Sequence, residues 1–141
     1  MLKIFYSFML GLFIFSLSIA AEKIVVIDVQ KVVTTSKTGQ KAQAEIEKAA
    51  QKLKSEIEKK QKSGTSQSNM QTFIQEKQQE LLKKRQEVAQ QFMKKLQEAI
   101  KEYASKNGYT LVLDKGSTLY TKPELDKTQD FIKFFDSKYG K

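Results

Sequence analysis

The architecture of this protein follows from residues 38–106, TGQKAQAEIEKAAQKLKSEIEKKQKSGTSQSNMQTFIQEKQQELLKKRQEVAQQFMKKLQEAIKEYASK. This stretch has no proline, and it is dense in Ala, Leu, Lys, Glu and Gln, which are good helix formers. Turn-forming residues gather only in Ser63–Asn69, where Gly64 lies, and they separate two helices. We therefore expect a long antiparallel helical hairpin over residues 37–106, with its turn near residues 63–69.

Apolar residues recur at steps of three or four in both arms of this hairpin. They are Ala42, Ile46, Ala49, Leu53 and Ile57 in the first arm, and Phe73, Ile74, Leu81, Val88, Phe92, Leu96, Ala99 and Tyr103 in the second. Such a narrow stripe is typical of a coiled-coil seam and leaves the outer faces of both helices in solvent. The sequence therefore predicts a coiled-coil hairpin that projects as an arm.

Residues 1–20 have the pattern of a secretory signal peptide. Lys3 is the only charge before Glu22, the segment Ile4–Ile19 is almost entirely apolar, and Ser18 and Ala20 are small. A basic start, an apolar middle and a small-x-small end are typical of a cleaved signal, so we expect cleavage after Ala20 and a mature chain outside the cytoplasm. The alternative is an uncleaved membrane anchor, because the apolar run is nearly long enough to span a bilayer.

The two ends of the mature chain, residues 21–36 and 107–141, are expected to fold together into a small head. Strands are predicted at Lys23–Val29, Tyr109–Leu113 and Thr118–Tyr120, with a last helix at about 126–139. Ser36 or Thr38 is expected to cap the first arm, and Gly108 to end the second. The fold class is therefore α+β, a small β-sheet head that carries the hairpin.

This head is thin for a stable core, and the chain has no Cys with which to cross-link it. Its strands would also leave unpaired edges that invite another strand. We therefore expect several copies to pool their sheets. The candidates for the oligomerisation core are the apolar residues of the strands: Ile24, Val26, Ile27, Val29, Leu111, Val112, Leu113 and Leu119.

Catalysis is not supported by the sequence. His and Cys are absent, so the commonest general base and the soft nucleophile are both missing. Asp28 and Asp114 each end a predicted strand, and we interpret them as caps of the following turns rather than as a carboxylate pair. No metal-ligand cluster or phosphate loop is visible. We expect no enzyme activity and no cofactor.

Positive charge is concentrated on the hairpin. From Lys37 to Lys106 there are 16 Lys and Arg against 9 Glu, a net of +7, whereas the rest of the mature chain has a net of +1. The excess predicts a positive field that attracts acidic partners, although Lys-rich helices are also simply soluble. Candidates for partner binding are the basic cluster Lys83, Lys84 and Arg85 and, near the tip, Met70 and Phe73. Phe92 and Met93 are expected to fill the seam between the helices.

The order of these segments resembles the Skp/OmpH family of periplasmic chaperones. The resemblance rests on KIVVIDVQK at residues 23–31, on a basic helical hairpin, and on LQEAI at 96–100 followed by GYTLVLDKG at 108–116 and Leu119-Tyr120. It implies a homotrimer in which three heads form a shared β-barrel and three hairpins surround a cavity. Unfolded outer-membrane proteins would be held in that cavity without ATP.

Two departures from the family pattern bear on this expectation. The hairpin is shorter than in the longer members, and Lys127 follows Asp126 where the family usually has an aliphatic residue. Some members are suggested to bind lipopolysaccharide through basic tentacle residues. Those positions cannot be matched one by one, so contact with lipopolysaccharide or another anionic lipid stays open.

Two other functions fit the residues alone. A basic helical protein with a pI near 9.6 could bind nucleic acid, but the predicted signal peptide and the single Arg count against that function. A passive coiled-coil spacer in the envelope is the other alternative. Secretion, client binding and oligomeric state separate these alternatives from a chaperone.

Overall fold

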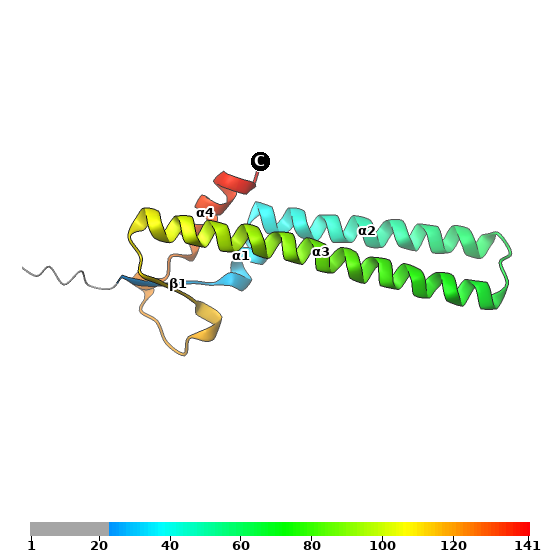
Figure 1. Ribbon diagram of the computed structural model, residues 1–141, viewed down its shortest axis with the longest axis horizontal. Helices are drawn as coiled ribbons and strands as arrows, with labels where there is room; N and C mark the ends of the chain where they lie inside the picture. Colours follow the sequence, from blue (N-terminus) through cyan, green and yellow to red (C-terminus); the bar gives the residue numbers. More distant parts are fainter. Residues whose placement is uncertain (1–22) are drawn as a thin grey trace, which may run out of the picture.

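The computed structural model describes residues 23–141. Its elements follow in the order β1 (Ile24–Ile27), α1 (Val29–Thr35), α2 (Lys37–Lys62), α3 (Gln67–Asn107), β2 (Leu111–Asp114) and α4 (Thr128–Tyr139), with two short 3-10 turns, η1 (Lys115–Ser117) and η2 (Pro123–Leu125), between β2 and α4. The fold is mostly helical with a small sheet, and a two-helix arm extends from one end (Figure 1). The predicted signal peptide lies outside the described residues. Within residues 23–141 no helix is both long and apolar enough to cross a membrane.

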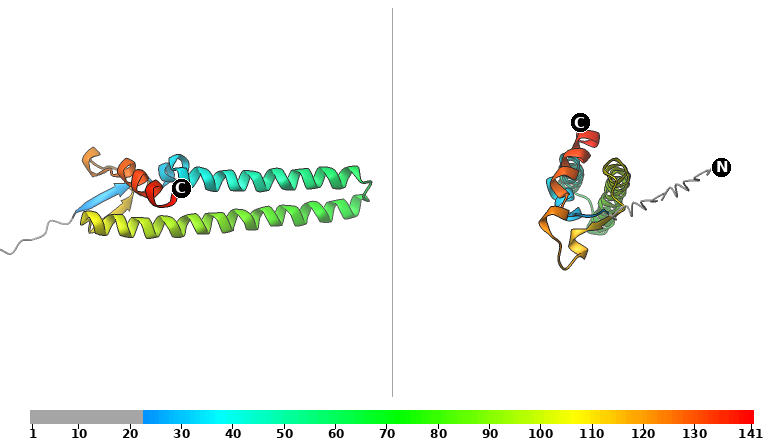
Figure 2. Two further views of the ribbon diagram at one scale, coloured as in Figure 1. Left: turned by 90° about the horizontal axis from the view of Figure 1, so that it is seen from above. Right: turned by 90° about the vertical axis from the view of Figure 1, so that its left-hand side faces the viewer.

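The predicted hairpin is confirmed, because α2 and α3 pack side by side along the whole arm (Figure 2). The turn is shorter than predicted, since α3 already begins at Gln67 and only four residues separate the helices. Gly64 adopts a left-handed φ of 71° in this turn, and Gly108 ends α3 with a φ of 66°. Both conformations are readily adopted by glycine and rarely by residues with a Cβ.

The sheet contains two strands that run parallel, with Ile24 opposite Leu111 and Ile27 opposite Asp114. The third predicted strand, Thr118–Tyr120, is wrong: these residues form no strand, and Leu119 is fully exposed. The physical reason is that the chain leaves β2 through η1 and offers Thr118–Tyr120 no neighbouring strand to bond. One edge of β1 is occupied by an isolated bridge between Val26 and Asp126, whereas among the described residues β2 bonds only to β1.

The link between β1 and α2 is helical, which the sequence analysis did not predict. Asp28 begins α1, because its carboxylate accepts a hydrogen bond from the Lys31 backbone N–H at 2.8 Å. Ser36 ends α1 and also caps α2, since its hydroxyl accepts from the Gly39 N–H at 2.9 Å. The predicted capping roles of Asp28 and Ser36 are therefore confirmed.

The core of the head is built from one face of α3 and one face of α4. Its buried members are Ile27, Val32, Phe92, Leu96, Ala99, Tyr103, Phe131 and Phe135. The Phe92 and Phe135 rings meet edge to face with centroids 5.7 Å apart, and Tyr103 contacts Phe131 in the same way at 5.4 Å. The final turns of α3 are therefore anchored in the head, and the remainder of α2 and α3 projects beyond it (Figure 1).

The predicted core residues divide into two groups in the single chain. Val26 and Ile27 are buried, and Val29 and Val112 pack against the core while partly exposed. Ile24, Leu111, Leu113 and Leu119 are exposed. Six of these eight residues lie in strands, whereas Val29 lies in α1 and Leu119 in a loop, and only half of the set is covered by the chain's own fold.

Candidate functional site

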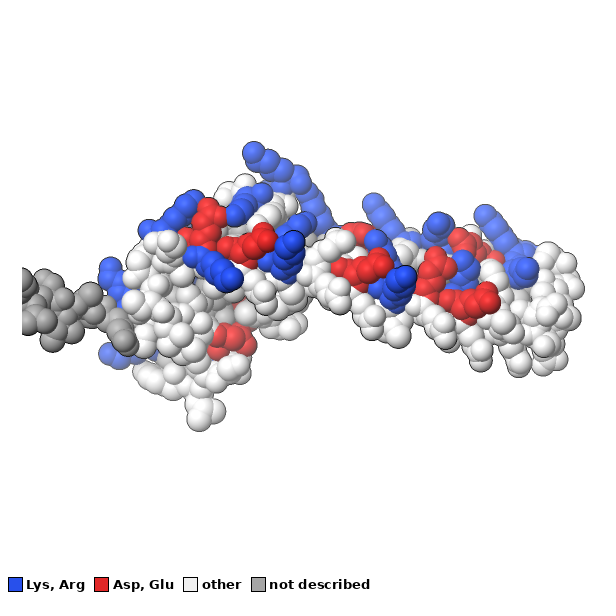
Figure 3. All heavy atoms as spheres, viewed as in Figure 1, with Lys and Arg blue, Asp and Glu red and all other residues white. Residues whose placement is uncertain are grey.

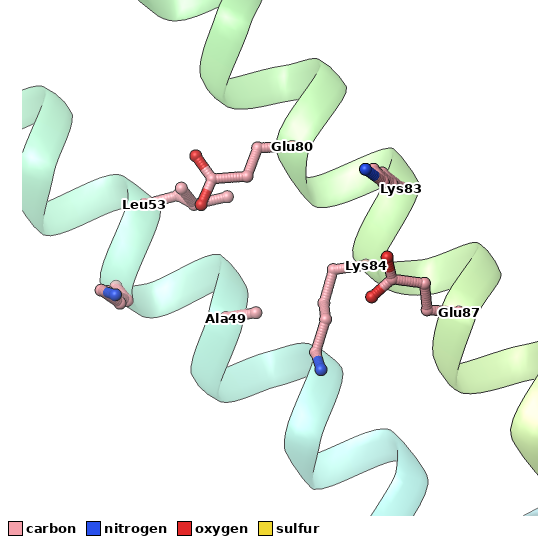
Figure 4. A pocket seen from close by; sticks show the side chains of 7 residues that line it. Ala49, Leu53, Glu80, Lys83, Lys84 and Glu87 are labelled. Carbon is pink, nitrogen blue, oxygen red and sulfur yellow. The ribbon is translucent and has the colours of Figure 1, made fainter.

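One broad side of the hairpin carries a charged hollow of about 350 Å³. Its lining consists of Ala49, Lys52, Leu53, Glu80, Lys83, Lys84 and Glu87 (Figure 4). A smaller hollow nearer the head continues this side and is lined in part by Lys41, Glu45 and Lys95. We call the residues lining these two hollows the charged face. In Figure 3 charged side chains gather over the upper part of the hairpin, while its lower border is mostly uncharged.

Ion pairs cross between the two helices of the hairpin. Lys84 of α3 reaches Glu45 of α2, with Nζ 2.5 Å from Oε1. Closer to the tip, Lys77 lies 2.7 Å from Glu56 across the seam and 2.8 Å from Glu80 on its own helix. The hydrogen bonds that Lys77 donates to Glu56 and then to Glu80 raise the pKa of Lys77, and the bond from Lys77 lowers the pKa of Glu56. The hydrogen bond to Glu45 likewise raises the pKa of Lys84. These lysines are therefore both charged and paired.

The basic cluster predicted at residues 83–85 is not a single patch. Lys83 and Lys84 both line the charged hollow, but Lys84 is bonded to Glu45. Arg85 is exposed and does not line that hollow. Successive residues on an α-helix point about 100° apart, so three adjacent side chains cannot share one face. Lys83 and Arg85 are the members of this set that remain accessible.

The two tip candidates are both half-buried. The ring of Phe73 is covered by two ammonium groups, those of Lys60 at 5.3 Å and Lys77 at 5.5 Å from its centroid. Cation–π contacts of this kind stabilise the packing of an aromatic ring at the surface. Met70 and Phe73 therefore contribute to the seam and still expose part of their apolar surface.

The opposite side of the hairpin carries two apolar hollows, which sequence reasoning missed. The proximal apolar hollow, next to the head, has a volume of about 210 Å³ and is lined by Val33, Gly39, Ala42, Gln43, Ile46, Val88, Ala89, Phe92 and Met93. The distal apolar hollow, about 350 Å³, is lined by Ala50, Leu53, Lys54, Ile57, Glu58, Lys77, Gln78 and Leu81. We call the residues that line these two hollows and neither charged hollow the apolar face, although Lys54, Glu58 and Lys77 among them are charged. It includes Met93, which was predicted to fill the seam but is 42% exposed.

A signal for the apolar face does exist in the sequence. On α3, Gln78, Leu82, Ala89 and Met93 follow one another at intervals of four, seven and four residues, which places them on one side of a helix. None of these four is charged, but Arg85, three residues after Leu82 and four before Ala89, lies on the same side of the helix and interrupts the stripe. Leu82, between the two hollows, is 57% exposed. This stripe on α3 becomes visible only when the residues that form the seam with α2 are set aside.

The head presents a second uncovered surface. Its exposed apolar residues are Ile24, Leu111, Leu113, Leu119, Tyr120 and Leu125. Leu111 and Leu113 lie two residues apart in β2 and so point to the same face of the sheet. Concentrated exposed apolar side chains of this kind are typical of an interaction surface.

The carboxylates at the strand ends serve the fold. The Asp114 carboxylate accepts from the Val29 N–H at 3.2 Å, and Thr128 Oγ1 accepts from the Asp28 N–H at 2.9 Å. Burial opposes the ionisation of Asp126, but hydrogen bonds from Lys115 and Thr128 outweigh it and lower its pKa to about 2. Asp28 therefore caps α1 as predicted, whereas the Asp114 carboxylate does not cap η1 and instead connects β2 to the start of α1.

A short head that carries a two-helix arm with one charged and one apolar side defines a class of protein that binds through extended surfaces. The comparison with family models gives the family: the model described as "Outer membrane protein (OmpH-like)" matches residues 64–135, which are 72 of the 141 residues. The chain belongs to this OmpH-like, or Skp, family of outer membrane protein chaperones. Members of the family are periplasmic and non-enzymatic, and the family implies unfolded outer-membrane proteins as clients.

A solved structure shows the same fold. It is that of an OmpH-like protein from Caulobacter crescentus CB15, described as a candidate outer membrane chaperone, with a TM-score of 0.67. The identity is 14%, and the alignment covers 84% of this chain and 86% of that one. No curated protein sequence matches this chain. The likeness to the solved structure is therefore one of fold.

Proposed function

We propose that this protein is an ATP-independent holdase of the periplasm, which captures unfolded outer-membrane proteins between the arms of a homotrimer and prevents their aggregation. The single observation that carries the proposal is the arm itself. It is a projecting hairpin with accessible cations and with hollows that are open to solvent. A holdase needs several weak contacts with many sequences, and an extended surface provides them.

Assembly is proposed to occur through the head. The outer edge of β2 and the exposed side chains of Leu111, Leu113 and Leu119 would pair with the same elements of other copies and form a shared barrel. Burial of apolar side chains and pairing of open strand edges both favour this arrangement. The mature chain would begin after Ala20, and residues 21–36 and 107–141 would form the assembly domain.

Capture is proposed to begin with electrostatic attraction. The hairpin's net charge of +7 attracts acidic clients over roughly 10 Å at 0.1 M salt. Lys83 and Arg85 are the accessible cations of the predicted cluster. Long lysine side chains also lay their methylenes along apolar surface while the ammonium groups stay in water.

The test of the proposed function uses the processed protein and an outer-membrane β-barrel protein unfolded in urea. On dilution of the urea, the chaperone should suppress light scattering at a near-stoichiometric ratio of trimer to client, without ATP. A passive spacer would leave the scattering unchanged. A nucleic-acid-binding protein would instead bind duplex DNA in a gel-shift assay at the same concentration.

The electrostatic step of client capture can be tested with charge-reversal variants. Lys83→Glu with Arg85→Glu should slow client capture at low salt, because two accessible cations are reversed. Lys84→Gln is the matched control, since it removes a cation that is already paired with Glu45. Capture rates that do not change with these variants or with salt would contradict the electrostatic role.

A further inference from the structure

We infer that Asn107-Gly108, at the end of α3, is a deamidation site that the folded head keeps unreactive and that becomes reactive when the chain unfolds. This modification site is separate from the proposed holdase function and does not depend on it. Copies of the protein that stay unfolded should therefore lose, with time, the ability to form the head, whereas folded copies should keep it.

The reaction needs an asparagine whose following backbone nitrogen can reach its side chain. In an unfolded chain the Gly108 nitrogen gives its proton to a base and attacks the side-chain carbonyl carbon, Cγ, of Asn107. Ammonia leaves, and a cyclic imide forms. Water then opens the imide at either of its two carbonyl groups. The product at position 107 is an aspartate or an isoaspartate, and the isoaspartate adds one methylene to the backbone.

The chain contains its own comparison for this reaction, because its asparagines are Asn69 and Asn107. Gly108 has no side chain, so its nitrogen approaches Asn107 without steric hindrance. Met70 follows Asn69 and places a long side chain beside the corresponding nitrogen. In an unfolded chain Asn107 is therefore the more reactive of the two.

In the folded protein both reacting groups are held by hydrogen bonds. The Asn107 side-chain amide donates from Nδ2 to the Tyr103 carbonyl at 2.7 Å. The Gly108 N–H donates to the Ser105 carbonyl at 3.3 Å, and Gly108 has a left-handed φ of 66° where the chain leaves α3 for β2 (Figure 1). Ring closure would have to break both bonds and turn Asn107 out of its helical conformation.

Conformation, and not burial, provides this protection. Asn107 and Gly108 are both exposed, so water and base reach them in the folded protein. The folded chain can therefore react only when the end of α3 opens locally. Such openings are rare in a segment that is tied to a packed core, and Tyr103 belongs to the core of the head.

The residues after the site begin the pairing of the two strands. Tyr109 packs on Tyr103, with ring centroids 5.7 Å apart. The Thr110 N–H donates to the Lys23 carbonyl at 3.0 Å, directly before β1 and β2 pair. An extra backbone methylene at position 107 would displace Tyr109 and Thr110 together and disturb the register of β2 against β1. The new carboxylate would also stand at the negative end of the α3 dipole.

The reactivity is tested by ageing the protein in mildly alkaline buffer, with and without guanidinium chloride. Mass spectrometry of the peptides that contain Asn69 and Asn107 gives the rate at each position. Deamidation at 107 should be at least about tenfold faster in the denaturant, because the folded chain reacts only through local opening. Equal rates at 107 in both conditions would overturn the inference. So would a rate at 107 in denaturant that is no higher than the rate at 69.

A second measurement follows refolding after the denaturant is diluted. Aged wild type should recover its near-ultraviolet circular dichroism, which reports tyrosine packing, only in proportion to its unmodified fraction. Asn107→Gln is the matched control: its longer side chain closes a ring far more slowly, so the aged variant should recover fully. Full recovery of wild type that is deamidated at 107 would contradict the effect on the head.

Asn107→Asp distinguishes the two products, because it carries the new charge without the extra methylene. When freshly made, this variant should refold nearly as well as fresh wild type. A loss as large as that of the aged wild type would contradict the displaced register of β2.

Discussion

At the scale of single residues, two carboxylates join parts of the head that are distant in sequence. Asp126 accepts from Lys115 at 2.5 Å and from the Thr128 N–H at 3.0 Å, at the point where the chain passes β1. Asp136 of α4 accepts from the Lys37 and Thr38 N–H groups at 3.0 and 3.3 Å. These are the first N–H groups of α2, which have no partner within their own helix. The arm is therefore fixed to the head at its first turn.

Because of Asp126, the free energy of unfolding should depend on pH in the acid range. Its pKa in the folded protein is about 2, below the ordinary value of 3.8. Because the folded pKa is depressed, the stabilisation is fully present above about pH 4 and is lost as the pH falls towards 2. We expect Asp126→Asn to cost about 2 kcal/mol at pH 7 and almost nothing at pH 2, measured by urea unfolding at one protein concentration.

Glu124→Gln, which removes a neighbouring exposed carboxylate, is the control for charge alone. It should cost less than Asp126→Asn at neutral pH, because exposed charges contribute little. A loss for Asp126→Asn that is the same at pH 7 and pH 2 would contradict the assigned hydrogen bonds.

Asp136 should be needed for the anchoring of the arm. Asp136→Ala leaves two N–H groups at the start of α2 without their acceptor, and a lost helix cap costs about 1 kcal/mol. The free energy of unfolding should fall by that amount, and hydrogen exchange of the Lys37 and Thr38 amides should accelerate. Asp136→Asn retains one acceptor oxygen and should be intermediate. Unchanged exchange in Asp136→Ala would show that the cap is not formed in solution.

At the scale of elements, the seam of the hairpin is thin. Leu53 and Val88 are buried, but no residue from 54 to 87, a range that the structure describes in full, is buried. Hollows lie on both sides of Leu53, which lines the charged one and the distal apolar one. The outer half of the arm is therefore held by half-buried apolar residues and by ion pairs, and it should open locally more easily than the half next to the head.

Leu53→Ala should loosen this half of the arm. Truncating a buried leucine costs 2–5 kcal/mol, and we expect a value near about 2 kcal/mol because open hollows already adjoin the site. Hydrogen exchange should increase between residues 54 and 87 and stay unchanged near Phe131 and Phe135. The comparison variant Leu82→Ala, at an exposed position, should change stability by less than about 1 kcal/mol. Uniform acceleration along the chain would mean that the arm and head unfold as one unit.

Local pattern was sufficient to predict α2, α3 and α4 but not α1. The helices have good helix formers and clear ends, such as the turn at Gly64 and the left-handed Gly108. In α1 the sequence VQKVVTT is rich in β-branched residues, which favour strands. The cap at Asp28 and the burial of Val32 in the core overcome that preference. The charged and apolar sides of the arm were not predicted, because they depend on how α2 and α3 are rotated about their own axes when they pack together.

At the scale of the whole molecule, the head is incomplete as a single copy. Leu111, Leu113 and Leu119 are exposed, and within residues 23–141 β2 bonds to β1 alone. The alternating apolar pattern predicted Leu111 and Leu113 as strand positions, but which apolar residues the chain covers itself depends on how α3 and α4 pack. The proposed association through the head would cover the group that stays exposed.

Leu111→Lys combined with Leu113→Lys should prevent association. The charges would stand on the exposed face of β2, where burial against another copy would require their desolvation. Wild type is expected to sediment as a trimer, and the double variant as a folded monomer with unchanged helix content by circular dichroism. Lys122→Gln, at an exposed position near this surface, is the control. A wild type that sediments as a monomer would contradict the assembly, and with it the enclosed space between the arms.

The parallel pairing of β1 with β2 also determines the order in which this chain can fold. Ile24 pairs with Leu111, so β1 cannot pair with β2 until almost the entire chain has been synthesised. Closing so long a loop directly is slow, because contacts distant in sequence carry a large entropic cost before they form. Formation of α2 and α3 removes most of that cost, since an antiparallel helix pair brings its two ends together. During folding the arm thus brings β1 and β2 close together. A nascent chain that stops before residue 111 has no completed head.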